Sequence, residues 1–518
     1  MNMRIHTDVP ITQRPSHQFR LPTPNLRSHL FPLLVAALLP ISSISAQGYR
    51  VRIDARAQAV SFRGLMADSV AATDIVTGSN GGIFTSDGFA ARCSNEAFCY
   101  FYRPGDTQRG IPVSSSASLV LWGIGVQGLT IHASGRVVAD AGKDEVWPAV
   151  EPWAQLIEAY ADYSRSRFTA RAGRQFLTSR LEPIGFDGGW LRVRTPARGL
   201  DVTAYGGWGL GQAAVVPVSS PALNPLDEYR PRDRQLVAGA EVAWSDGPLD
   251  ARAEYRREVD PEDDHFVSER AAVSFTLQPW RFLQTRGGID YNLAEGHVGS
   301  GDLSVTYLES RFSLTGGARR YRPYFSLWTL WGAFSPVPYN TVHGSARVRI
   351  TDWLTANGRA ERYWFESADV STALVPDLED SGWRVSLGGT VRPDEQWTFD
   401  ASYLADFGPG AASQSFDAGV NYSATPALTL GAYGGRLERP LELRFYDATT
   451  TWVGGRAEYR LRNQWRFWTD VAWYDDDRDR PDTGANSFDQ VRLRGGVSLT
   501  FGTNADRAPL PRARRLRP

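Results

Sequence analysis

Apolar and polar residues alternate along most of the chain, the pattern of β-strands whose two faces meet different surroundings. Near the C-terminus, Val491 and Leu493 alternate with Arg492 and Arg494, and the segment 395–408 repeats the pattern with other residues. The alternating stretches run for about 11 to 14 residues, whereas strands of soluble proteins usually have about 5 or 6. The length of the pattern favours strands that cross a membrane over the strands of a soluble sandwich.

The connections between these stretches alternate between short and long. Tight turns are expected at 245–248 and 425–426, and long loops at 211–232 and 366–380. Tight turns on one side and long loops on the other are typical of outer-membrane barrels. The sequence therefore predicts an all-β fold, a transmembrane antiparallel up-and-down β-barrel of about 22 strands (range 18 to 26). With an even strand count, both ends of the barrel lie on the short-turn, periplasmic side.

Large aromatic residues recur at both ends of the expected strands. One set follows short turns, and the other lies near the opposite strand ends in the same apolar phase. The two sets are Trp280, Trp353, Trp397 and Trp465, and Tyr291, Trp364, Phe407 and Trp473. Aromatic girdles at the two membrane interfaces have this distribution.

Residues 1–46 have the organisation of a secretory signal peptide. Arg20 and Arg27 precede an apolar run at 30–41, and small residues follow at 43–46. A membrane anchor is the alternative, but twelve apolar residues with two prolines are too short to cross a bilayer. The mature barrel is expected over 47–502, followed by a basic periplasmic tail over 503–518.

Composition agrees with a barrel. The chain has a formal net charge of -1, so charge gives no reason to expect a nucleic-acid partner. Aromatic residues make up 12% of the chain and glycine is abundant, yet mean hydropathy is -0.33. A wall with a lipid-facing apolar side and a wet lumen explains this mixture.

The two cysteines, Cys93 and Cys99, predict a disulfide, because an exported protein enters an oxidising compartment. Two cysteines also exclude a covalently attached c-type haem on this chain and a thiolate zinc set. The pair lies in segment 64–115, which is long and rich in aromatics. We expect this segment to be a loop folded at the barrel mouth; a mobile outer loop is the alternative.

The last strand, Arg494–Phe501, resembles the assembly signal of bacterial outer-membrane barrels, with Gly496, Leu499 and Phe501 at its pattern positions. The run Arg171–Gln175 followed by Gly185–Gly189 is similar to porin-type barrels, where such strands flank an outer loop. The resemblance covers about 48–502. It implies assembly by the barrel-assembly machinery, and outer-membrane lipid and lipopolysaccharide as surroundings.

Many arginines fall on the inward phase of the expected strands. They could form a cross-strand charge network with carboxylates, or line a path with a preference for anions. The inward set is Arg171, Arg192, Arg194, Arg252, Arg256, Arg286, Arg347, Arg349, Arg359, Arg384, Arg492 and Arg494.

Asp475, Asp477 and Asp479 alternate in the last expected outer loop. Their spacing is similar to the start of a calcium loop, but the glycine turn and closing glutamate are missing, so a solvated acidic loop is favoured. No set of histidines, serines and carboxylates with catalytic spacing is found. We therefore expect no enzyme activity and no cofactor.

A porin-like channel for passive diffusion of small hydrophilic solutes, with a preference for anions, is the leading functional hypothesis. The alternative is a structural sheath that encloses a periplasmic multihaem cytochrome in an electron conduit, because wide barrels with an early cysteine pair resemble such sheaths.

Overall fold

The computed structural model describes residues 46–503, except 79–81, 94–96, 143, 145, 147–152, 196–198, 211–234, 260–265, 323–337, 367–380, 409–412, 440–447, 463 and 479–486. The predicted signal peptide therefore lies outside the described residues, apart from Ala46. The predicted tail lies outside them apart from Thr503.

The described residues are almost entirely β-strands, with one short 3-10 helix, η2 (Ala72–Asp74). The N-terminal strands are β1 (Ala46–Ala71), β2 (Ile75–Thr77), β3 (Ile83–Thr85), β4 (Ala91–Cys93), β5 (Phe98–Gly110), β6 (Pro112–Ile124), β7 (Leu129–Asp140) and β8 (Ala154–Ser164). The next are β9 (Phe168–Leu177), β10 (Ile184–Arg194), β11 (Leu200–Gly209), β12 (Leu236–Asp246), β13 (Leu249–Val259), β14 (Phe266–Trp280), β15 (Leu283–Asn292), β16 (His297–Leu308) and β17 (Phe312–Tyr321). The last are β18 (Tyr339–Arg349), β19 (Leu354–Phe365), β20 (Ser381–Val391), β21 (Trp397–Phe407), β22 (Ser413–Thr425), β23 (Leu428–Arg439), β24 (Ala448–Leu461), β25 (Trp465–Arg478) and β26 (Phe488–Gly502).

The barrel wall is a closed antiparallel sheet made of β1 and the 21 strands from β6 to β26. Each wall strand pairs with its sequence neighbours, and β1 closes the ring by pairing with both β6 and β26. Arg50 lies opposite Gly502, so the wall begins and ends at the same end of the barrel. Closure leaves no unpaired strand edge in the wall, as hydrocarbon requires. The predicted antiparallel barrel of 22 strands is confirmed.

The outer face of the wall is apolar, since Val273, Leu387 and Val491 project outward and are 51%, 57% and 59% exposed. Both predicted sets of girdle aromatics share this outward phase and are exposed. Trp397 stacks with Phe399 on its own strand, at a centroid distance of 5.7 Å. A closed wall with an apolar exterior between two aromatic belts places the barrel in the outer membrane. No helix among the described residues is long and apolar enough to cross a membrane.

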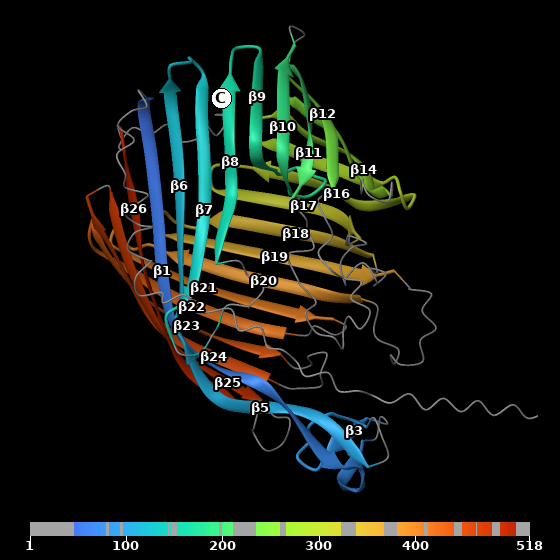
Figure 1. Cartoon of the computed structure of the whole chain (residues 1–518), viewed down its shortest axis with the longest axis vertical. Coiled ribbons are helices and arrows are strands. Elements are labelled where there is room, and N and C mark those ends of the chain that lie inside the picture. The colour runs from blue at the N-terminus through green and yellow to red at the C-terminus, as the bar shows by residue number, and fades with distance from the viewer. Residues whose placement is uncertain are drawn as a thin grey trace, which may run out of the picture. The chain divides into compact units, whose positions relative to one another are not determined.

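The segment 64–115 differs from the expected loop. β1 continues past the wall, and its second half, Val60 to Ala71, pairs with β5 instead of β6 and β26. β4 adds to the far edge of β5. Figure 1 shows β1 and β5 running together away from β6 toward β3. The segment is therefore mostly an extended β-ribbon, because the alternation of apolar and polar residues in β1 continues beyond the end of the wall.

The disulfide predicted between Cys93 and Cys99 is confirmed, and it joins directly opposite residues of β4 and β5. Cys99 is fully buried, and Phe89 stacks on Phe101 at a centroid distance of 5.7 Å. These residues form a small core of their own, which the disulfide cross-links. The extension is thus an ordered β-structure on the end of the barrel opposite the chain's entry into the wall.

Candidate functional site

The predicted inward arginines lie on the inner face of the wall, and most form ion pairs with carboxylates. Arg171 lies 2.6 Å from Asp162, and Arg494 lies 2.7 Å from Asp470. Seven of the twelve form ion pairs. Arg171, Arg192, Arg252, Arg384 and Arg494 pair with carboxylates on neighbouring strands, and Arg256 and Arg359 pair with carboxylates on their own strands. Alternating charges across adjacent strands stabilise the wall and reduce the net positive field of the lumen.

The other five predicted arginines have different surroundings. Arg194 donates to the carbonyl of Ser166, and Arg492 donates to Gln490 and lies over the ring of Tyr474. The remaining three, on β15 and β18, form no ion pair among the described residues: Arg286, Arg347 and Arg349. All three are exposed.

The six-residue connection between β9 and β10, residues 178–183, folds inward and lies against the inner wall of β13 to β16. We call these residues the inward loop. Leu181 is only 1% exposed, and its carbonyl accepts hydrogen bonds from Arg256 on β13 and Arg270 on β14. Arg256 also donates to the carbonyl of Glu182, at 3.0 Å.

The tip of the inward loop reaches further along the same wall. Arg180 donates to the carbonyl of Gly288 on β15 at 2.8 Å, and lies 2.6 Å from the carboxylate of Asp302 on β16. Glycine at position 288 makes room for this contact, because a Cβ would stand 2.6 Å from the Arg180 guanidinium and 2.8 Å from the carbonyl oxygen of Val273. Charge-assisted contacts to four successive strands fix the loop in one position.

The inward loop divides the inner wall into two regions. Beneath it, inward side chains are buried: Arg256 is 1% exposed and Glu254 is 8% exposed. Next to it, Phe186 and Val237 form a small apolar cluster with Ile184. On β18 to β24, by contrast, most charged inward side chains are exposed. The exposed inward residues there include Arg347, Arg349, Asn357, Arg359, Arg384, Asp400, Ser402, Asp417 and Arg456. Among the described residues, β18 to β24 therefore form a long accessible stretch of the lumen wall that the inward loop leaves uncovered.

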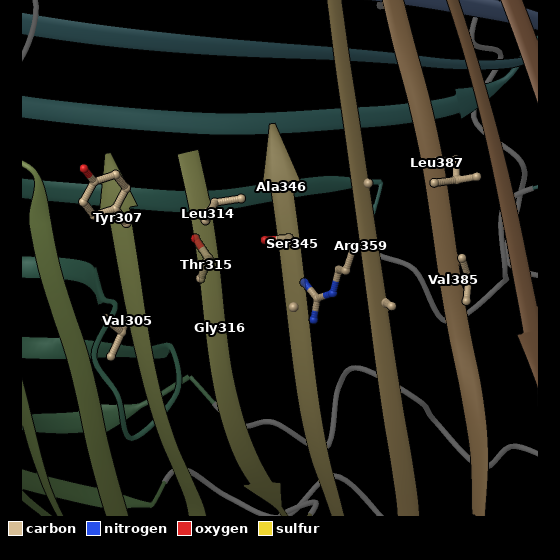
Figure 2. Close-up of a pocket in the computed structure, with 13 residues that line it drawn as sticks. Val305, Tyr307, Leu314, Thr315, Gly316, Ser345, Ala346, Arg359, Val385 and Leu387 are labelled. Atoms are coloured by element: carbon tan, nitrogen blue, oxygen red, sulfur yellow. The ribbon is translucent and has the colours of Figure 1, made fainter. Parts of the chain in front are cut away.

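A hollow of about 710 Å³ lies on the outer face, across β16 to β20. In Figure 2, Val305, Leu314 and Leu387 extend from separate strands, and Gly316 lies on the same strand as Leu314. No atom lies within 4 Å of the Cβ position of Gly316 or Gly344, so the missing side chains produce the hollow. Its apolar lining faces the hydrocarbon, and it belongs to the membrane-facing surface.

The acidic run in β25 is part of the sheet, where a loop was expected. Asp475 and Asp477 lie opposite Thr451 and Thr449 of β24, and Asp479 lies outside the described residues. Asp477 accepts a hydrogen bond from Ser487. Within the described part of the chain, no group of three or more histidine, cysteine or acidic side chains is placed to hold a metal ion.

Sequence reasoning missed the inward loop. Its direction depends on partners 74 to 122 positions away, such as Arg256 for Glu182 and Asp302 for Arg180. Within the loop, Glu182 has a positive φ of 74°, which marks the sharp turn of the chain but leaves no trace in the sequence. Only the charged pair Arg180 and Glu182 in so short a connection could have drawn attention to it.

Comparison with known proteins bears on the fold. No family model and no curated protein matches the sequence. Among solved structures, a variant of the ferric enterobactin receptor PfeA from Pseudomonas aeruginosa, in complex with enterobactin, matches with a TM-score of 0.51 and 9% identity. That match covers 88% of this chain and 82% of the receptor. OccK8 (OprE) from the same organism matches with a TM-score of 0.36 and 10% identity, covering 88% of this chain and 98% of OccK8. At these identities the comparisons concern the outer-membrane barrel fold alone.

Proposed function

We propose that the chain is an outer-membrane channel for passive diffusion of small hydrophilic solutes. One observation carries the proposal: the inward loop covers the wall at β13 to β16, while charged and polar side chains on β18 to β24 stay exposed to the lumen. A barrel of this strand number encloses an aqueous path unless something fills it. A polar path of this kind passes solutes that are soluble in water.

The charge arrangement supports weak ion selectivity. Seven of the twelve inward arginines are paired with carboxylates, and Arg194 and Arg492 bond to other polar groups. The remaining three, on β15 and β18, form no ion pair among the described residues. A preference for anions therefore depends mainly on Arg286, Arg347 and Arg349. Because the selectivity of a pore is set at its narrowest ring, size and hydrogen bonding contribute more than net charge.

The membrane environment completes the proposal. The apolar outer face contacts outer-membrane lipid, and the end of the wall opposite the chain termini lies at the level of the lipopolysaccharide headgroups. The final strand β26, with Gly496, Leu499 and Phe501, is the segment that we expect the barrel-assembly machinery to bind. The alternative function is a sheath around a periplasmic cytochrome. No contact among the described residues specifically favours it.

Conductance in planar lipid bilayers tests the proposal. Purified full-length protein should give stable steps of conductance in potassium chloride, with a cation-to-anion permeability ratio near unity. Substitution of Arg286 and Arg347 by glutamine should move that ratio toward cations without abolishing conductance. Folded protein, inserted in the bilayer, that gives no steps at any voltage would show that the lumen is closed and that the chain is no channel.

A further inference from the structure

A separate cavity of about 340 Å³ is recessed into the inner wall of β19 to β24. This volume lies within the range of small-molecule sites, roughly 300 to 1,000 Å³. Its inward-phase lining combines polar and aromatic side chains: Asn357, Thr390, Asp400, Ser402, Asp417, Tyr433, Trp452 and Arg456. It lies on the part of the wall that the inward loop leaves accessible.

Glycines on neighbouring strands create the recess. Gly419 lies opposite Asp400, and a Cβ on Gly419 would stand 2.7 Å from the carboxylate of Asp400. Gly435 lies opposite Trp452, whose indole occupies the space that a Cβ on Gly435 would need. The missing side chains let the carboxylate and the indole lie along the wall, so they form the floor of the cavity.

The two carboxylates differ from the other acidic groups of the lumen. Asp406 and Asp470 are bound by arginines, whereas Asp400 and Asp417 have no hydrogen bond or ion pair among the described residues. Both are exposed to the lumen, and their acceptor oxygens are available to a solute. Arg456 lies in the same cavity and donates to Asn421, with no carboxylate on it.

The mixture of groups selects a class of ligand. Two carboxylates with available oxygens repel an anion, and the guanidinium of Arg456 disfavours a cation in the same space. A neutral molecule with many hydroxyls can donate to Asp400 and Asp417 and accept from Arg456 at once. Trp452 and Tyr433 add apolar ring faces, which suit the C–H face of a sugar ring.

We propose that this cavity binds a neutral sugar, of one or two rings, and thereby makes the channel selective for sugars among hydrophilic solutes. The inference rests on the proposed channel function for its physiological role, although binding itself requires only the folded barrel. Trp452 provides the stacking surface, and Asp400 and Asp417 orient the hydroxyls.

Isothermal titration calorimetry of the detergent-solubilised full chain with maltose tests this inference. We expect saturable binding, weakened about 2- to 12-fold in Trp452→Ala, because an aromatic contact contributes roughly 0.5–1.5 kcal/mol. Trp452→Phe should retain most of the affinity. Trp468→Ala is the matched control, since Trp468 also faces the lumen and lies against a glycine, Gly496, but is outside the cavity.

The double variant Asp400→Asn and Asp417→Asn should weaken maltose binding while leaving the aromatic side chains unchanged. If Trp452→Ala fails to fold, this double variant tests the inference in its place. Heat-modifiable migration on gels verifies folding. The inference is overturned if folded protein does not bind maltose, if Trp468→Ala weakens binding as much as Trp452→Ala, or if choline binds in place of maltose. Binding by a barrel that does not conduct would refute the channel and leave the sugar site standing.

Discussion

The substitution Arg180→Met examines the position of the inward loop. It keeps most of the side-chain volume and removes the hydrogen bond to Gly288 and the ion pair with Asp302. A hydrogen bond from a charged donor contributes about 1.5–3 kcal/mol, and a partly exposed ion pair about 0.2–1 kcal/mol. Asp302 is 41% exposed on its side chain, so no buried charge remains after the change.

Together these contacts stabilise the docked loop by about 2–4 kcal/mol, which is roughly a 30- to 1,000-fold change in the ratio of docked to undocked loop. Without these contacts the tip at position 180 moves in the conducting path, while Arg256 and Arg270 still bind the carbonyls of Leu181 and Glu182. Single-channel recordings of the variant should therefore flicker between open and partly blocked levels, while the wild-type protein gives steady current.

Arg252→Met is the control for this prediction. Arg252 lies on β13, four positions from Arg256, and pairs with Glu241 at 3.6 Å without contacting the inward loop. It should leave the current steady. If folded Arg180→Met conducts as steadily as the wild type, the contacts at Gly288 and Asp302 do not hold the loop, and the account of the inward loop is wrong.

Three other predictions concern separate parts of the molecule. Replacing Cys93 and Cys99 by serine should make the β1–β5 extension more sensitive to external protease, seen as cleavage on gels, while conductance stays unchanged; equal resistance to protease would contradict the role of the disulfide. Phe501→Ala should lower the fraction of chains that reach the heat-modifiable folded form in outer-membrane preparations, and undiminished assembly would count against the signal. In bilayers, Arg349→Gln should lower anion permeability modestly, and an unchanged reversal potential in a salt gradient would show that Arg349 does not face the ion path.

The sequence was sufficient for the barrel because alternation is a local property of each strand. Val491 and Leu493 face outward and Arg492 and Arg494 inward in the structure, as their phase predicts. Repeated over the chain, this pattern gave the number of wall strands. Its failure at segment 64–115 has the same origin, since alternation marks a strand but does not reveal which partner the strand pairs with.

The site residues depended on contacts that no local pattern encodes. Arg180 and Gly288 are 108 positions apart, and only the curvature of the closed wall brings them together. Likewise, Asp400 and Trp452 share a cavity because β21 and β24 are joined through β22 and β23, with glycines at the matching positions. The phase of a strand determines whether a side chain faces the lumen. Its position along the barrel axis and its neighbours depend on the register between strands, which the turns and bulges determine.

Swelling of liposomes that contain the purified protein tests most directly whether the lumen is an open path for small hydrophilic solutes. We predict rapid swelling in isotonic solutions of small neutral sugars, with rates that fall as the solutes become larger. Proteoliposomes with folded barrels that swell no faster than empty liposomes, in every solute, would contradict the account.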